Sequence, residues 1–175
     1  MQEQWLHISD IPVQGREFYF EGDQDWISLC SEIGLEYEVS KDTSALLGVF
    51  PQKHGIFFKG FIKGQITAPC SRCLEPARTD IDHKFEIFED FEETEREPLG
   101  TGILKFENGH WMVNVRQVIR EQLVLAMPDK VLCSEKCLGL CPECGANINS
   151  GLCRCELEPG DPRLAKLRQI KIKTH

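Results

Sequence analysis

A dense group of cysteines constrains the fold of this 175-residue chain more than any other feature. Six of the nine cysteines lie within residues 133–155, around the pentapeptide Cys141-Pro142-Glu143-Cys144-Gly145. In such a C-x2-C turn two sulfurs converge on one cation, and the glycine permits the tight reversal. A tetrahedral zinc ion needs two further ligands, and Cys153 and Cys155 form the nearest pair that could supply them. The pattern therefore predicts a small module held together by zinc.

A second C-x2-C pair, Cys70 and Cys73, follows an apolar stretch earlier in the chain. We consider three roles for it: metal binding, redox chemistry, or a buried pair without function. A thioredoxin-like redox pair would precede a helix, which Pro76 and the alternating residues after it disfavour. Two metal arrangements stay open. Either one zinc takes four of the six C-terminal thiols, or two sites form, one from Cys141, Cys144, Cys153 and Cys155 and the other from Cys70, Cys73, Cys133 and Cys137.

The start of the chain favours metal over disulfides for these thiols. Residues 1–5 lack the basic and apolar regions of a secretion signal. No apolar run reaches the length that spans a membrane. We therefore expect a cytoplasmic protein, in which clustered cysteines stay reduced and more often bind metal. Cys30, which has no other thiol nearby, is expected to be an ordinary core residue.

The charges of the chain are strongly segregated. The formal net charge is -8, and acidic residues dominate residues 86–97, for which we expect a solvated loop. Residues 163–173 carry only basic charges, and Asp161 and Pro162 predict that an amphipathic helix begins there. Because phosphate contacts require nearby cations, this basic tail is compatible with local contact with RNA or with an acidic protein surface. The alternative is that the tail is only a solvated helix end. The residues predicted to contact RNA are Arg72, Arg163, Lys166, Arg168, Lys171 and Lys173.

Alternating stretches of sequence predict an antiparallel sheet. Residues 35–39 alternate, residues 45–50 are apolar, and residues 55–67 are rich in strand-forming side chains. Residues 80–88 alternate again, so the first C-x2-C pair is expected at the tip of a hairpin. Glycines at positions 60 and 64 favour bulges or close strand approach, as in a sheet that curves toward a barrel.

Two helices are predicted to accompany this sheet. Residues 25–33 repeat apolar side chains at three- and four-residue steps. The dipeptide Asn108-Gly109 predicts a tight hairpin turn. After that turn, Asn114 and Gln117 form a capping-box pattern, which predicts a helix that ends before Pro128.

These elements predict an α+β protein in two parts. Residues 1–130 are expected to form a curved, barrel-like antiparallel sheet with a few helices and the C-x2-C hairpin. Residues 131–175 are expected to form the zinc-binding module and the basic helix. The chain has no Walker-type phosphate loop and no serine, histidine and acid placed as a triad, so an enzyme is not predicted.

Four motifs, in this order, resemble the YceD family. They are residues 69–76 (PCSRCLEP), 123–128 (LVLAMP), 139–149 (GLCPECGANIN) and 161–167 (DPRLAKL). The resemblance spans about residues 40–170. Members of the family are described as large ribosomal RNA subunit accumulation proteins of bacteria and plastids. Some of them lack most of the C-terminal cysteines, which implies that the zinc module stabilises rather than performs the shared function.

The resemblance implies a non-catalytic factor that supports accumulation of large-subunit ribosomal RNA, by binding that RNA or an assembling particle. An alternative is a zinc-dependent interaction module that docks a ribosomal protein. The third hypothesis is an enzyme, either a thiol redox protein that uses Cys70 and Cys73 or a metal hydrolase. All-thiolate zinc sites are normally closed and structural, which disfavours this third hypothesis.

Overall fold

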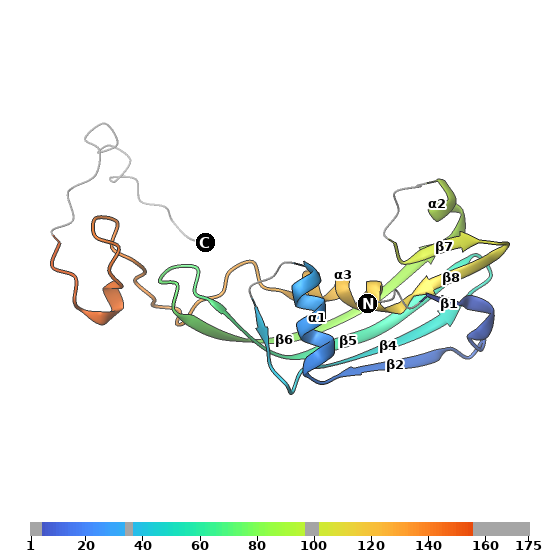
Figure 1. Cartoon of the computed structure of the whole chain (residues 1–175), viewed down its shortest axis with the longest axis horizontal. Coiled ribbons are helices and arrows are strands. Elements are labelled where there is room, and N and C mark those ends of the chain that lie inside the picture. The colour runs from blue at the N-terminus through green and yellow to red at the C-terminus, as the bar shows by residue number, and fades with distance from the viewer. Residues whose placement is uncertain (1–4, 34–36, 97–101, 156–175) are drawn as a thin grey trace, which may run out of the picture.

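Two antiparallel sheets and three α-helices form the described part of the computed structural model, which comprises residues 5–33, 37–96 and 102–155 (Figure 1). The strands are β1 (Trp5–His7), β2 (Arg16–Glu21), β3 (Glu38–Val39), β4 (Ser44–Pro51), β5 (Gly55–Pro69), β6 (Pro76–Asp90), β7 (Leu104–Glu107) and β8 (His110–Asn114). The helices are α1 (Asp23–Ile33), α2 (Phe91–Arg96) and α3 (Val115–Ala126), with short 3-10 turns η1 (Ile8–Asp10) and η2 (Ile148–Ser150). The predicted basic helix, with Arg163, Lys166, Arg168, Lys171 and Lys173, lies outside the described residues.

The larger sheet is built around a long hairpin of β5 and β6. Every residue of β5 pairs with one of β6, from Gly55 opposite Asp90 to Pro69 opposite Pro76. On its other side β5 pairs with β4, which pairs with β2, and β3 continues along β5 beyond the end of β4. The hairpin extends past the helices, and the first C-x2-C pair lies at its tip (Figure 1).

The strands of the described residues form open sheets and close no barrel, so the barrel-like character expected from the sequence is not confirmed. β2 and β6 are the outer strands of the larger sheet, while β1, β8 and β7 form a separate sheet in that order. The register of β5 with β6 is continuous, so neither Gly60 nor Gly64 marks a bulge. A Cβ atom at Gly60 would instead lie 2.7 Å from the Phe85 ring. This glycine therefore serves close packing of a core ring against the strand.

One face of the larger sheet packs against α1 and α3 to form the main core. Alternate side chains of β5 point to this face. Those that are fully buried are Ile56, Phe58, Ile62 and Ile66. Trp26 of α1 is buried too, and its Nε1 donates a hydrogen bond of 2.8 Å to the carbonyl oxygen of Thr43. Cys30 lies in the same core, as predicted.

The local signals around α3 act as predicted. The side-chain oxygen of Asn114 accepts a hydrogen bond of 3.1 Å from the backbone N–H of Gln117, which caps the helix. The helix ends at Ala126, two residues before Pro128. The turn Asn108-Gly109 joins β7 to β8, with both residues at positive φ.

The acidic segment does not form the expected solvated loop. Its first residues belong to β6, and α2 follows, capped by a hydrogen bond of 2.7 Å from the backbone N–H of Glu92 to the Asp90 carboxylate. The Phe91 ring stacks on Trp111 of β8, with 4.5 Å between the ring centroids. This apolar contact holds an otherwise acidic helix against the smaller sheet.

Candidate metal centres

The eight cysteines other than Cys30 form two groups of four in space. We call Cys70, Cys73, Cys133 and Cys137 the hairpin cluster, and Cys141, Cys144, Cys153 and Cys155 the terminal cluster. Within each cluster all four sulfur atoms lie within 4.8 Å of one another, and all eight thiols are free. Both clusters could therefore hold a metal ion.

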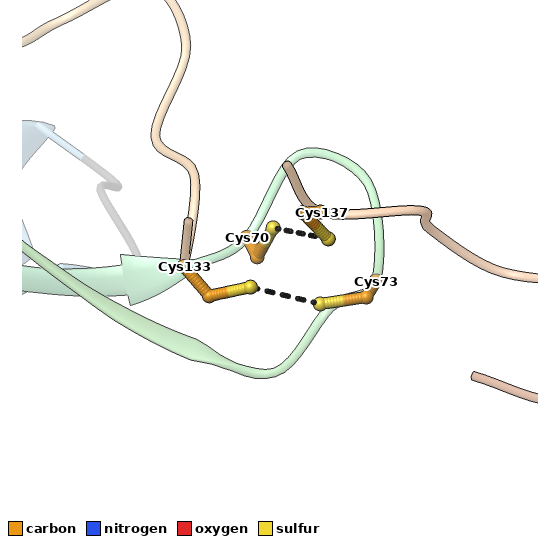
Figure 2. Close-up of side chains that lie close together, drawn as sticks. All are labelled: Cys70, Cys73, Cys133 and Cys137. Atoms are coloured by element: carbon orange, nitrogen blue, oxygen red, sulfur yellow. Dashed lines mark hydrogen bonds between the residues drawn. The ribbon is translucent and has the colours of Figure 1, made fainter. Parts of the chain in front are cut away.

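The separations between the sulfur atoms match tetrahedral coordination of a metal ion better than disulfide bonds. The Sγ atoms of Cys70 and Cys137 are 3.8 Å apart, and those of Cys73 and Cys133 are 3.6 Å apart (Figure 2). In the terminal cluster, the corresponding distance between Cys144 and Cys153 is 3.8 Å. Four sulfurs at about 2.3 Å from a central Zn²⁺ would be separated by about 3.8 Å, whereas a disulfide bond is about 2.05 Å long.

The hairpin cluster joins segments that are distant in sequence. Cys70 and Cys73 lie on the turn between β5 and β6, and Cys133 and Cys137 approach them from the segment that follows α3 (Figure 2). A small apolar group surrounds the sulfurs, with Ala68, Ala77 and Val131 buried among them. Three of the four cysteines are buried, whereas in the terminal cluster only Cys141 is. The hairpin cluster is therefore the better protected of the two.

The two C-x2-C turns have the same backbone geometry. In each turn the N–H of the first cysteine, Cys70 or Cys141, donates a hydrogen bond of 2.8 Å to the carbonyl oxygen five residues later. The residue four positions after that cysteine donates back to its carbonyl oxygen, at 2.9 Å from Leu74 and 2.8 Å from Gly145. Both of these residues have positive φ, 64° and 72°. A left-handed conformation costs a residue other than glycine roughly 1–2 kcal/mol.

Backbone N–H groups prepare the first cysteine of each cluster to bind as a thiolate. The N–H of Cys133, with those of Arg72 and Cys73, lowers the pKa of Cys70 to about 6. In the terminal cluster, the backbone N–H of Cys144 is the main cause that lowers the pKa of Cys141 to about 7. Hydrogen bonds to a thiolate stabilise its charge, so these sulfurs ionise before an ordinary cysteine does.

One thiol of each cluster, Cys133 or Cys155, ionises with difficulty. The Cys137 side chain is the main cause that raises the pKa of Cys133 to about 12, and the Cys144 side chain likewise raises that of Cys155 to about 12. Each of these thiols keeps its proton in a hydrogen bond to the neighbouring sulfur, and repulsion between thiolates adds a smaller effect. A cation at the centre of each cluster would remove this repulsion, which is the electrostatic setting of a metal site.

On acidification, the terminal cluster is expected to release a bound metal ion before the hairpin cluster does. Protons compete with the metal for thiolates, so acid removes a bound ion. Three of the four thiols of the hairpin cluster are buried and only Cys141 of the terminal cluster is, so protons reach the terminal thiolates more easily. A colorimetric chelator should therefore record two release steps as pH falls. Replacing Cys141 and Cys144 by serine should remove the earlier step, and loss of the later step instead would contradict this order.

Arg72 fastens the hairpin tip to the C-terminal segment. Its guanidinium donates hydrogen bonds to the carbonyl oxygens of Cys137, at 2.7 Å, and Glu135, at 3.3 Å. Its own carbonyl oxygen accepts from the N–H of Leu140, at 3.1 Å. The predicted RNA contact of Arg72 remains a prediction, while the structure gives this side chain a role that sequence analysis missed.

Asn149 is a second residue that sequence analysis missed. Its Nδ2 atom donates to the sulfur of Cys137 at 3.3 Å, and its side-chain oxygen accepts from the N–H of Leu138 at 2.8 Å. Asn149 lies on η2, between the two cysteine pairs of the terminal cluster, so it links that cluster to a sulfur of the hairpin cluster. Its polar side chain between two C-terminal cysteine pairs was the only sequence signal for this role.

The fold and these sites define a class: an α+β protein with open antiparallel sheets and two clusters of four cysteines that could each hold a metal ion. The chain belongs to the YceD family, because the family model "Large ribosomal RNA subunit accumulation protein YceD" matches residues 58–171. This match includes all eight clustered cysteines. The family name assigns its members to accumulation of large-subunit ribosomal RNA.

Comparison with curated proteins gives relatives in bacteria and in a plant. Uncharacterized proteins of Mycobacterium tuberculosis and Mycobacterium bovis are 29% identical over 162 residues, which cover 83% of this chain and 72% of theirs. The Zea mays protein "Large ribosomal RNA subunit accumulation protein YCED homolog 1, chloroplastic" is 27% identical over 125 residues, 55% of this chain and 43% of the maize protein. No solved structure matches. In the described residues, no helix is long and apolar enough to cross a membrane.

Proposed function

We propose that this protein is a non-catalytic, cytoplasmic factor of ribosome biogenesis that supports accumulation of large-subunit ribosomal RNA. The protein does so by binding that RNA or an assembling particle. The observation that carries the proposal is the family match over residues 58–171, which spans both cysteine clusters. The name of the maize relative, which refers to the same process, supports it.

We propose that each cluster binds one Zn²⁺ ion. Four thiolates at these separations are a donor set that Zn²⁺ takes in closed, structural sites. Closed sites leave no open position for a substrate, which supports a structural rather than a catalytic role. The metal of the hairpin cluster would hold residues 131–155 against the hairpin tip. We propose that residues 1–130 and 131–175 form two separate parts of the chain.

Reversing three charges of the basic tail is expected to weaken RNA binding. In the variant Lys166→Glu, Arg168→Glu, Lys171→Glu, three cations that neutralise phosphates become anions. Affinity for large-subunit ribosomal RNA should then fall, and its salt dependence should become shallower. Both quantities are measured by titrating the purified RNA at several salt concentrations.

A matched control separates local contact from total charge. The variant Lys53→Glu, Lys63→Glu, Lys84→Glu changes the net charge by the same amount at residues of the sheet domain. It should retain more affinity than the tail variant. Equal affinities of the two variants would contradict the assignment of the tail as the RNA-binding segment.

A second candidate function is docking of a ribosomal protein. Large apolar side chains are exposed beside the cysteine clusters, namely Leu74, Leu138 and Leu152. Exposed apolar residues around a rigid centre are typical of contacts with protein rather than with RNA phosphates. Association with assembling particles that survives ribonuclease treatment would favour this function over RNA binding.

A further inference from the structure

The two C-x2-C turns differ at the position that most favours glycine. Their hydrogen bonds are the same, and both turns require a positive φ at the residue after the second cysteine. The terminal cluster has Gly145 there, and the hairpin cluster has Leu74. Since Gly145 satisfies the same turn, the geometry alone does not require a leucine.

Packing does not explain the leucine either. The side chain of Leu74 is 66% exposed, although the cysteines on either side of the turn are buried. Leu74 is also absent from the apolar group that surrounds the hairpin cluster. Backbone strain that the fold does not need concentrates at sites of ligand contact. The leucine is therefore best explained by what its side chain touches outside this chain.

A small hollow adjoins Leu74. Its volume is about 200 Å³, and its lining is formed mainly by small or rigid residues: Thr67, Ala68, Pro69 and Pro76, together with Glu38 and Leu74 itself. This is smaller than the pockets of roughly 300–1,000 Å³ that take drug-sized molecules and cofactors. It suits one side chain of a partner instead.

The charges beside the hollow identify the kind of partner. Glu38 lines the hollow and Glu75 follows Leu74 directly; both are exposed, and the described residues provide neither side chain with an ion-pair partner. An exposed cation, Arg78, lies opposite Thr67 on β6, so two carboxylates stand here against one arginine. Carboxylates repel RNA phosphates and attract lysine or arginine. The apolar contact and the negative rim together fit a basic protein better than RNA.

We propose that Leu74 and this hollow dock a basic protein segment. The segment places an apolar side chain against Leu74 and its lysine or arginine residues near Glu38 and Glu75. The proposal deepens the proposed function, on which it rests only for the choice of probe: the proteins of the large ribosomal subunit, freed of RNA.

Photo-crosslinking from position 74 tests this directly. The full-length, zinc-loaded protein with a benzophenone amino acid at position 74 is mixed with total large-subunit protein, and separately with large-subunit ribosomal RNA. We expect cross-links to one or a few basic proteins. The same group at Leu125, which is 68% exposed on α3, should not give these cross-links. Cross-links to RNA alone, or none above the Leu125 control, would overturn the proposal.

The variant Leu74→Gly separates docking from a structural role. It should compete for the cross-linked protein about ten- to a hundredfold less well than wild type, as expected for loss of one buried leucine contact. Its denaturation midpoint and its zinc content should be no lower than those of wild type. A lower midpoint would make the leucine structural, and unchanged competition would remove the docking site. Ribosomal RNA binding retained in either case would leave the proposed function standing.

Discussion

Replacing Cys137 by serine is expected to detach residues 131–155 from the hairpin tip while the sheets stay folded. Serine is a poor zinc ligand, and structural zinc sites contribute about 10–16 kcal/mol in small peptides at neutral pH. The apolar group around the hairpin cluster is too small to replace this contribution. Hydrogen exchange should therefore accelerate at the N–H groups of Ser71 and Leu140, which bond across the junction. The N–H groups of α3 should keep their protection.

Cys30→Ser is the matched control for this experiment. Cys30 is buried in the main core and belongs to neither cluster. Its replacement should reduce stability modestly but leave exchange in residues 131–155 unchanged. Slow exchange in that segment of the Cys137→Ser variant would contradict a metal-dependent junction.

Trp26→Ala is expected to have the largest effect on the main core. The side chain is 1% exposed, and its truncation leaves a large cavity and removes the hydrogen bond to the carbonyl oxygen of Thr43. Such truncations cost about 3–5 kcal/mol, a large part of the 5–15 kcal/mol that stabilises a typical domain. Chemical denaturation followed by circular dichroism measures the loss.

The neighbouring residue provides the control. Ile27 is 64% exposed on the same helix, so Ile27→Ala should change the free energy of unfolding by no more than about 0.5 kcal/mol. Equal losses for the two variants would show that α1 does not pack on the sheet through Trp26.

Short-range signals in the sequence were sufficient for much of the fold. The turn at Asn108-Gly109, the cap at Asn114 and the hairpin tip at Cys70 all depend on a few adjacent residues. These signals act through neighbouring residues, so they can be predicted without knowledge of the tertiary structure. The acidic segment shows the limit of such local prediction. Its composition indicates a loop, but the long-range contact of Phe91 with Trp111 holds the segment as a helix against the smaller sheet.

The grouping of the cysteines could not be derived from spacing alone. Two arrangements fitted the sequence, and the structure places the sulfurs in two groups of four. What decides between them is the length of the β5–β6 hairpin, which carries Cys70 and Cys73 to the place where Cys133 and Cys137 arrive. Such a contact between residues about sixty positions apart depends on topology, which local patterns do not encode.

Leu74 illustrates information that is visible only when sequence and backbone are combined. The sequence shows leucine in one turn and glycine in the other, which by itself is an ordinary difference. Both positions have a positive φ, which favours glycine, so the leucine at position 74 needs a functional explanation. Arg72 is a similar case. The sequence suggests that its charge contacts RNA, whereas in the structure its guanidinium donates hydrogen bonds to two carbonyl oxygens.

The metal content of the protein tests the central claim most directly. Elemental analysis and native mass spectrometry of reduced protein, purified without added metal, should give two zinc ions per chain. The variant with Cys141 and Cys144 replaced by serine should retain one ion, and so should the variant with Cys70 and Cys73 replaced. A chain without metal, or with a single ion that survives replacement of Cys70 and Cys73, would contradict the two four-thiolate centres.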